Sequence, residues 1–236
     1  MLHVLIDIDE TILSVPEGIN ARASSLMFKK VFNLDADESM IDNVGKTEMG
    51  IIQEVLEKVG TVTSSSEHKS QVLEIPKEAY KVWGNTTSKE LKDHPARILP
   101  GIPELLTALS KNPSVKLGLL TGNSSYRAEA KLNSARLDTF FRDPETQILI
   151  GVFGEMAMKR EQLFDLVIQQ TTSEDRFVIL DDSLIGAKMA QTHNIPIIMV
   201  ATGKATAEQL LQLTPFVFSD LGESRWKQAA SLIVEM

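Results

Sequence analysis

The 236-residue sequence contains no cysteine, which excludes disulfide bonds and thiolate-bound metal sites. It also contains no apolar run near the ~20 residues that a membrane-spanning helix needs. Its first residues, MLHVLIDIDE, lack a basic segment and become acidic too early for a signal peptide. We therefore expect a cytoplasmic protein without a membrane partner.

Positive charge is scarce as well, with 24 lysines and arginines against 32 aspartates and glutamates and a formal net charge of −8. Nucleic-acid binding depends on basic side chains at phosphates, so this balance argues against nucleic acid as the main partner. The hydrophobic content of 43% is ordinary for a globular protein. The length permits one large domain or two smaller ones, and it leaves the choice between monomer and homodimer open.

The first half of the chain reads as helical after one short strand. LHVLI at 2–6 predicts a buried strand, because it is apolar, uninterrupted and followed by acids. We then expect a helix at about 20–33, two helices around Gly45 and one helix that starts near Pro76. The serine-rich stretch 61–70 predicts a loop. In the first helix, we expect one apolar face made of Leu26, Phe28, Val31 and Phe32.

From residue 96 onward, strand and helix patterns alternate. Expected strands include 115–120, 148–154, 177–180, 195–203 and 216–220, with helices at 102–111, 126–135, 157–170, 185–194 and 223–235. Such alternation predicts an α/β fold with a doubly wound parallel sheet. Because the all-helical block interrupts it just after the first strand, we expect a helical cap domain at 16–95 inserted into a core of 1–15 and 96–236.

Three predicted strands end in polar side chains. The three pairs are Asp7 and Asp9, Thr121 and Asn123, and Asp181 and Asp182. Carboxyl ends of parallel strands share one sheet edge, where ligands bind in open α/β sheets. Each pair alone is equally typical of a helix N-cap or a turn. The prediction of a site therefore rests on the recurrence of polar pairs at three strand ends.

Four acids at one edge would repel each other unless a divalent cation lay among them. An all-oxygen donor set suits Mg²⁺, which also binds substrate phosphate. TGN before a helix offers hydroxyl, amide and backbone N–H groups to an anion. Lys159 or Arg160, near the start of a later helix, would add a cation for phosphate.

With these motifs in order, the sequence resembles the haloacid dehalogenase-like hydrolase superfamily over nearly its whole length. DIDET, LLTGN, KR with EQL, and LDDSLIGAKMA resemble its four motifs, and LGLLTGN together with GVFGEMAMKREQL is most similar to phosphoglycolate phosphatase-like members. The resemblance implies a Rossmann-like core with a helical cap. It also implies a Mg²⁺-dependent phosphatase acting on a small phosphorylated metabolite, phosphoglycolate-like or a sugar phosphate.

The resemblance also implies residue roles. Asp7 would be the nucleophile, and Asp9 would be the general acid and base as well as a Mg²⁺ ligand through its carbonyl. Phosphate would be held by Thr121, Gly122 and Asn123. Asp181 and Asp182 would complete the metal site, with Asp182 the direct ligand. For the third-motif cation we prefer Arg160 to Lys159, although lysine is usual in the superfamily.

Two further positions concern the substrate and the first motif. GKTEMGI at 45–51 resembles a cap segment that reaches the substrate, which makes Lys46 a candidate ligand; the alternative is an ordinary capping turn with Thr47. Glu10 stands where most members have glycine, and the sequence offers no reason. The second aspartate, Asp9, favours phosphate esters over halide or phosphonate substrates. The alternatives are a phosphomutase of the β-phosphoglucomutase type or a non-catalytic binding protein.

Overall fold

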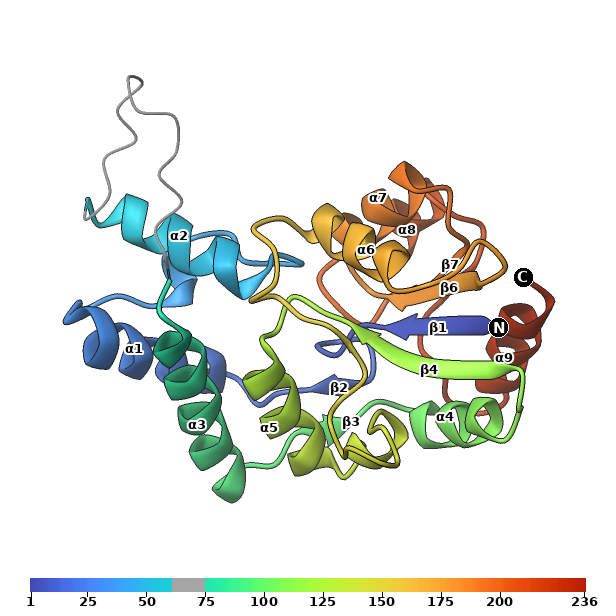
Figure 1. The fold of residues 1–236 in the computed structure, drawn as a ribbon, viewed down its shortest axis with the longest axis horizontal. Coiled ribbons are helices and arrows are strands. Elements are labelled where there is room, and N and C mark those ends of the chain that lie inside the picture. The colour runs from blue at the N-terminus through green and yellow to red at the C-terminus, as the bar shows by residue number, and fades with distance from the viewer. Residues whose placement is uncertain (61–74) are drawn as a thin grey trace.

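The computed structural model describes residues 1–60 and 75–236, so the loop expected at 61–70 lies outside the described residues. A parallel six-stranded sheet forms the centre of the molecule, with strand order β5-β4-β1-β6-β7-β8 (Figure 1). Its strands are β1 (Leu2–Ile6), β4 (Val115–Leu120), β5 (Gly151–Val152), β6 (Arg176–Asp181), β7 (Ile197–Val200) and β8 (Val217–Phe218). The predicted α/β fold with a doubly wound parallel sheet is confirmed.

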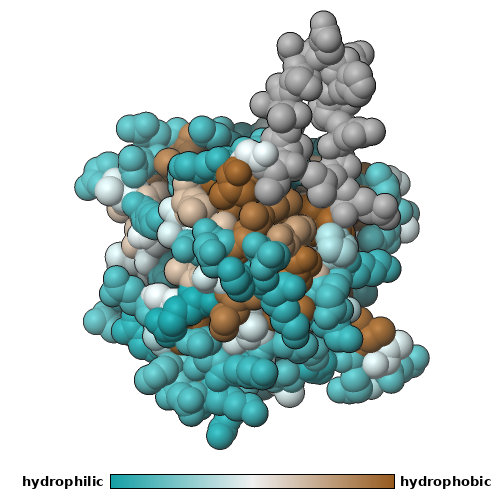
Figure 2. All heavy atoms as spheres, turned by 90° about the vertical axis from the view of Figure 1, so that its left-hand side faces the viewer, coloured by the Kyte–Doolittle hydropathy of each residue, from teal (hydrophilic) through white to brown (hydrophobic). Residues whose placement is uncertain are grey.

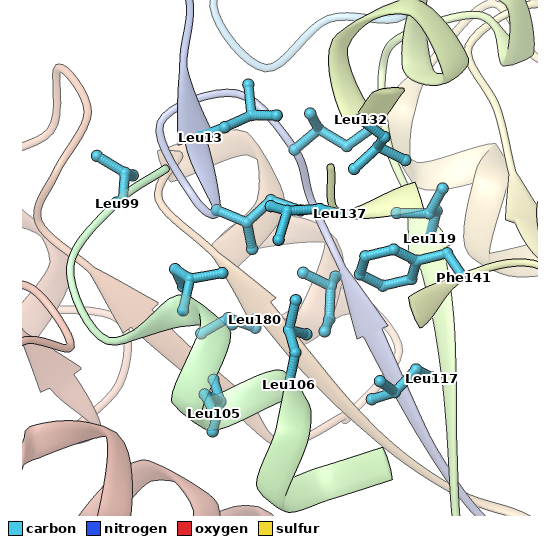
Figure 3. Packing of buried hydrophobic residues seen from close by; sticks show 14 of the residues in the cluster. Leu13, Leu99, Leu105, Leu106, Leu117, Leu119, Leu132, Leu137, Phe141 and Leu180 are labelled. Carbon is cyan, nitrogen blue, oxygen red and sulfur yellow. The ribbon is translucent and has the colours of Figure 1, made fainter. Parts of the chain in front are cut away.

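Helices cover both faces of this sheet (Figure 1). One face carries α4 (Ile102–Ser110), α5 (Ser125–Ala135) and α9 (Arg225–Glu235), and the short helix η2 (Asp138–Phe140) follows α5. The other face carries α6 (Arg160–Gln169), α7 (Leu184–Thr192) and α8 (Ala207–Leu211). In β1, Val4 and Ile6 point to the first face and Leu5 to the second, as the two-residue period of a strand requires. Figure 3 shows the leucine-rich core of the first face.

A helical insert interrupts the chain after β1. The antiparallel pair β2 (Leu13–Ser14) and β3 (Arg97–Ile98) brackets it. Between them lie α1 (Ile19–Phe32), η1 (Glu38–Met40), α2 (Glu48–Lys58) and α3 (Lys77–Asp93). The insert has its own buried cluster around Phe28, Ile52 and Trp83, and Figure 2 shows apolar atoms gathered on this side of the molecule.

The insert lies beyond the carboxyl ends of the strands, which point toward it (Figure 1). Helix α3 packs against both α1 and α5, so it joins the insert to the core. The edge of the sheet that carries the polar strand ends is therefore covered by the insert.

Several local predictions were wrong. Leu26 is 52% exposed, because α1 buries Ala23 and Met27 beside Phe28, which was predicted and is buried. Between α1 and Gly45, where a full helix was predicted, the chain forms the three-residue η1, which Asp37 caps at the Ser39 amide. The strand predicted at 148–154 is reduced to Gly151–Val152, and α8 was not predicted at all.

No helix among the described residues is both long and apolar enough to cross a membrane.

Candidate active site

The site begins at the end of the central strand. In the parallel register Ile6 lies between Leu119 of β4 and Leu180 of β6, and the Asp7 amide donates to the Leu180 carbonyl at 3.0 Å. Asp181, the last residue of β6, follows Leu180, and Thr121 is the first residue after the end of β4. All three polar side chains therefore reach one edge because the strands are neighbours and end at the same level.

Three carboxylates meet there. Asp7, Asp181 and Asp182 each offer an oxygen, and these oxygens lie within 4.8 Å of one another. Burial, and then the charge of neighbouring acids, raises the pKa of Asp182 to about 9. Burial also raises the pKa of Asp7 to about 6, although Arg160 opposes the shift. The group thus carries more negative charge than its buried position tolerates without a cation.

Two glycines let backbone approach these acids closely. A Cβ on Gly186 would lie 2.2 Å from Asp181 Oδ2, and one on Gly203 would lie 1.8 Å from Asp182 Oδ2. Real carbon–oxygen contacts are far longer, so any side chain at either position would displace a carboxylate. The glycine in the IGAKMA motif is explained by this contact.

The two adjacent acids of the fourth motif have different surroundings. Asp181 is fully buried, with Oδ2 2.8 Å from Arg160 Nη2 and Oδ1 accepting from the amide and hydroxyl of Ser183. Asp182 lines a cavity, and its Oδ1 accepts from the Thr11 hydroxyl at 3.0 Å. Asp181 is therefore engaged by protein donors, whereas Asp182 is the better placed of the two to bind something in the cavity.

The two candidate cations of the third motif, Lys159 and Arg160, lie in different surroundings. Arg160 is 3% exposed, and its Nη2 lies 3.0 Å from Asp7 Oδ1 and donates to Asp181 Oδ2 and the Leu120 carbonyl. Lys159 is exposed, and its backbone amide donates to Gln162 at the start of α6. Of the two, Arg160 is the one that the structure brings to the acids.

The turn after β4 is ordered by its own side chains. Thr121 Oγ1 accepts from the backbone amide and the side-chain amide of Asn123, at 3.2 and 2.9 Å. Gly122 lies against the insert: a Cβ there would be 2.1 Å from the Lys46 carbonyl, and its own carbonyl accepts from the Glu48 amide. The turn therefore lies between the acids and the first turn of α2.

Sequence reasoning missed Lys131, which is fully buried on α5. Its Nζ lies 2.8 and 2.6 Å from the two carboxylate oxygens of Asp9 and 2.7 Å from Asn123 Oδ1. Asn123 Nδ2 also donates to Asp9 at 2.8 Å. Burial acts to raise the pKa of Asp9, but the charges of Lys131 and Arg127 and the hydrogen bonds from Lys131 and Asn123 together outweigh it, so the net pKa is lowered. In this arrangement Asp9 is an ionised carboxylate.

Arg127, one turn earlier on α5, was missed too. It is buried, its Nη1 lies 3.1 Å from Glu48 and 3.5 Å from Glu38, and its guanidinium stacks 4.3 Å from the Trp83 ring. A signal was present: spacing of four places Arg127 and Lys131 on the stripe that α5 buries. Cations on a buried stripe require buried anions, which the insert and the first motif supply.

The insert reaches the site through the start of α2. Thr47 caps this helix, with Oγ1 accepting from Gly50, and the amides of Glu48 and Met49 donate to core carbonyls at Gly122 and Gly154. Lys46 lines the cavity, but its Nζ lies 2.8 and 2.6 Å from the two carboxylate oxygens of Glu54. The capping turn is thus present, and the Lys46 ammonium is paired within the insert.

Glu10 has a left-handed backbone, with φ of 55°. Glycine adopts this conformation without steric cost, which explains why glycine is the usual residue at this position in the resembled family. Here the Glu10 side chain accepts from the Ser14 hydroxyl at 2.8 Å, and its carbonyl accepts from Thr202. These contacts tie the turn after β1 to β2 and to the loop after β7.

The donor set fits Mg²⁺. It consists of oxygens alone, from three clustered carboxylates. The pKa values of Asp7 and Asp182 are raised chiefly by burial and further by the neighbouring acids, and a divalent ion would neutralise this buried negative charge.

A cavity of about 310 Å³ opens over these residues, between core and insert. It is lined from the core by Asp7, Asp9, Asn123, Arg160 and Asp182, and from the insert by residues that include Glu38, Lys46 and Glu48. Its volume is at the lower end for ligand sites, which suits a small molecule.

Comparison with known proteins gives one family match. The family model described as haloacid dehalogenase-like hydrolase matches residues 1–194. No curated protein matches the chain.

Solved structures share the fold at low identity. A phosphate complex of CbbY from Rhodobacter sphaeroides is 16% identical with a TM-score of 0.62, covering 94% of this chain and 95% of CbbY. A predicted phosphatase from Clostridium acetobutylicum is 17% identical (TM-score 0.60, coverage 99% and 98%). A putative beta-phosphoglucomutase from Thermotoga maritima is also 17% identical (TM-score 0.55, coverage 100% of both). At these identities the likeness establishes the fold.

Proposed function

The chain belongs to the haloacid dehalogenase-like hydrolases, and we propose that it is a Mg²⁺-dependent phosphatase for a small phosphate monoester. The substrate would be phosphoglycolate-like or a sugar phosphate, cleaved through an aspartyl-phosphate on Asp7. One observation carries the proposal: the Asp7 carboxylate lies in a cavity among two further acids, with Arg160 at 3.0 Å and the Thr121–Asn123 turn beside it.

In the first half of the proposed reaction, an Asp7 carboxylate oxygen attacks phosphorus and the bond from phosphorus to the ester oxygen breaks. Arg160 offsets the charge of Asp7, and the turn of Thr121, Gly122 and Asn123 offers hydroxyl and amide donors to the phosphoryl oxygens. Asp9 would give its proton to the departing oxygen, for which it must be protonated and leave Lys131.

In the second half, Asp9 as a carboxylate takes a proton from water, and the water oxygen attacks phosphorus. The bond between Asp7 and phosphorus breaks, which releases phosphate and restores the carboxylate. The contact with Lys131 holds Asp9 in this ionised form. Asp7, Asp182 and the Asp9 carbonyl would hold Mg²⁺, with Asp181 behind them. When bound, the ion would neutralise charge on the phosphoryl group.

The insert would act as a cap. We assign residues 16–95 to this cap domain and 1–15 with 96–236 to the catalytic core, because β2 and β3 bracket the insert and its hydrophobic cluster is separate. A cap over the cavity would exclude water and contact the leaving group.

The test is hydrolysis of p-nitrophenyl phosphate and of a panel of phosphomonoesters with Mg²⁺ and with EDTA. Activity should require Mg²⁺, and Asp7→Asn should reduce kcat by at least about 10³-fold, because the nucleophile is lost. Folding of the variant is checked by circular dichroism. Full activity of Asp7→Asn would overturn the nucleophile assignment.

Product analysis separates a phosphomutase from a phosphatase. The structural neighbour from Thermotoga maritima is described as a putative beta-phosphoglucomutase, which makes a mutase the alternative to test. A phosphatase releases one inorganic phosphate per substrate consumed, whereas a mutase yields an isomeric sugar phosphate without net release. Phosphorus NMR of a hexose phosphate reaction distinguishes the two.

A further inference from the structure

The cavity has a second wall with its own charge pattern. We use the name cap-side wall for five cavity-lining residues, which are Asn20, Glu38, Lys46 and Glu48 of the insert and Arg127 of α5. Under the proposed mechanism, the phosphoryl group lies at the acids and the rest of the substrate faces this wall. The charges of the wall therefore bear on which leaving groups are accepted.

The guanidinium of Arg127 is already paired with side chains of the cap-side wall. Its Nη1 lies between Glu48 at 3.1 Å and Glu38 at 3.5 Å, and its Nη2 donates to Asn20 Oδ1 at 2.8 Å. Both glutamates are at most 6% exposed. One cation thus faces two buried carboxylates, which leaves this part of the wall with an excess of negative charge.

The other cation of the wall is paired as well. Lys46 Nζ contacts both oxygens of Glu54. Lys204, which lines the cavity without an ion-pair partner among the described residues, belongs to the core loop after β7, beside Gly203 and hence near Asp182. Among described residues, the cap-side wall therefore offers no cation that is free for a second anionic group.

We propose that the cap-side wall selects phosphomonoesters whose leaving group carries hydroxyls and neither a second phosphate nor a carboxylate. This inference rests on the proposed function and narrows it. Hydroxyls donate hydrogen bonds to the carboxylates of Glu38 and Glu48, whereas a second anion would meet them in a poorly solvated cavity. A mutant CbbY was crystallised with xylulose-1,5-bisphosphate, which has two phosphates; we expect this chain to reject such a ligand.

Matched substrate pairs test the selection. Glycerol 3-phosphate and 3-phosphoglycerate differ by a hydroxymethyl against a carboxylate, as do 2-hydroxyethyl phosphate and phosphoglycolate. With Mg²⁺ at about pH 8, where exposed carboxylates are ionised, we expect kcat/KM to be at least about tenfold higher for the hydroxyl member of each pair. Equal values, or a preference for the carboxylate, would overturn the inference.

Charge removal in the wall supplies the second test. Glu48→Gln keeps the size of the side chain and its hydrogen bond to Arg127, and it should reduce the tenfold preference to about threefold or less by improving the carboxylate substrate. Glu57→Gln, on the exposed side of the same helix, should leave the preference unchanged. If Glu48→Gln does not fold, Glu38→Gln replaces it. An unchanged preference in a folded wall variant would contradict the role of the wall.

Binding separates failure of the inference from failure of the proposed function. Calorimetric titration of Asp7→Asn with glycerol 3-phosphate and with 3-phosphoglycerate measures the preference without turnover. Tighter binding of glycerol 3-phosphate supports the wall even if p-nitrophenyl phosphate is not hydrolysed, which would overturn the phosphatase proposal alone. Hydrolysis of p-nitrophenyl phosphate with tighter binding of 3-phosphoglycerate would overturn the wall alone.

Discussion

At the scale of single residues, the ion pair between Lys131 and Asp9 is the feature that departs most from the motif pattern. A buried ammonium loses its hydration, and the pKa of Lys131 is lowered by this burial and then by repulsion from Arg127. Its contacts with Asp9 and Asn123 compensate for that loss. One lysine thereby fixes the orientation of two residues from two different strand ends.

We expect Lys131→Met to lower kcat about 10- to 100-fold with a small change in KM. Without the ammonium, Asp9 keeps only the hydrogen bond from Asn123, and its pKa rises, so that the base form appears only at higher pH. The acidic limb of the kcat profile should therefore move to higher pH. The measurement is kcat and KM from pH 5 to 9.

Lys116→Met is the matched control, because this lysine is exposed near the opposite end of β4. An unshifted acidic limb in Lys131→Met would show that the ion pair does not set the protonation of Asp9.

At the scale of elements, the turn between β1 and β2 combines backbone strain with a stabilising side-chain contact. A left-handed residue other than glycine costs roughly 1–2 kcal/mol. Glu10 accepts this conformation and gains a hydrogen bond from Ser14. The structure thus accounts for a residue that looks misplaced in the first motif.

The stabilities of the alanine and glycine variants at position 10 should therefore follow an unusual order. Glu10→Ala keeps the strain and loses the hydrogen bond, whereas Glu10→Gly loses the hydrogen bond but relieves the strain. We expect the glycine variant to be more stable than the alanine variant by about 1 kcal/mol, the reverse of the order in a helix. Urea unfolding with both midpoint and slope measures the difference. An alanine variant of equal or greater stability would mean that the backbone conformation is not the controlling factor.

Sequence predicted the polar side chains at the strand ends because each lies at the end of its strand or directly after it, so local pattern and parallel topology suffice. Asp7, Thr121 and Asp181 belong to this class. The pairing of Lys131 with Asp9, by contrast, depends on how α5 lies against the sheet, and their separation of 122 residues leaves no local pattern. The exposed Leu26 is a similar case, since only the packing of α1 on α3 decides which face is buried.

At the scale of the whole molecule, stability should depend on pH through the clustered acids. The pKa of Asp182 is raised to about 9 and that of Asp7 to about 6, whereas unfolded aspartates titrate near pH 4. Between these values the metal-free folded protein binds more protons than the unfolded chain. The contribution of these groups is therefore complete at low pH and is lost as pH rises toward their folded pKa values.

Mg²⁺ should reverse this trend. Its binding requires deprotonated carboxylates, so we expect the increase in Tm to be larger at about pH 8 than at about pH 5. At 100 times its Kd, a ligand adds about 2.7 kcal/mol, which for this chain length is an increase of about 5–10 °C. Differential scanning fluorimetry with MgCl₂, and with NaCl at equal ionic strength, measures it. Asp182→Asn keeps the hydrogen bond from Thr11 but removes one charge, and it should remove most of the Mg²⁺ effect. Equal shifts at both pH values would contradict carboxylate binding, because only a site that titrates in this range couples ion binding to pH.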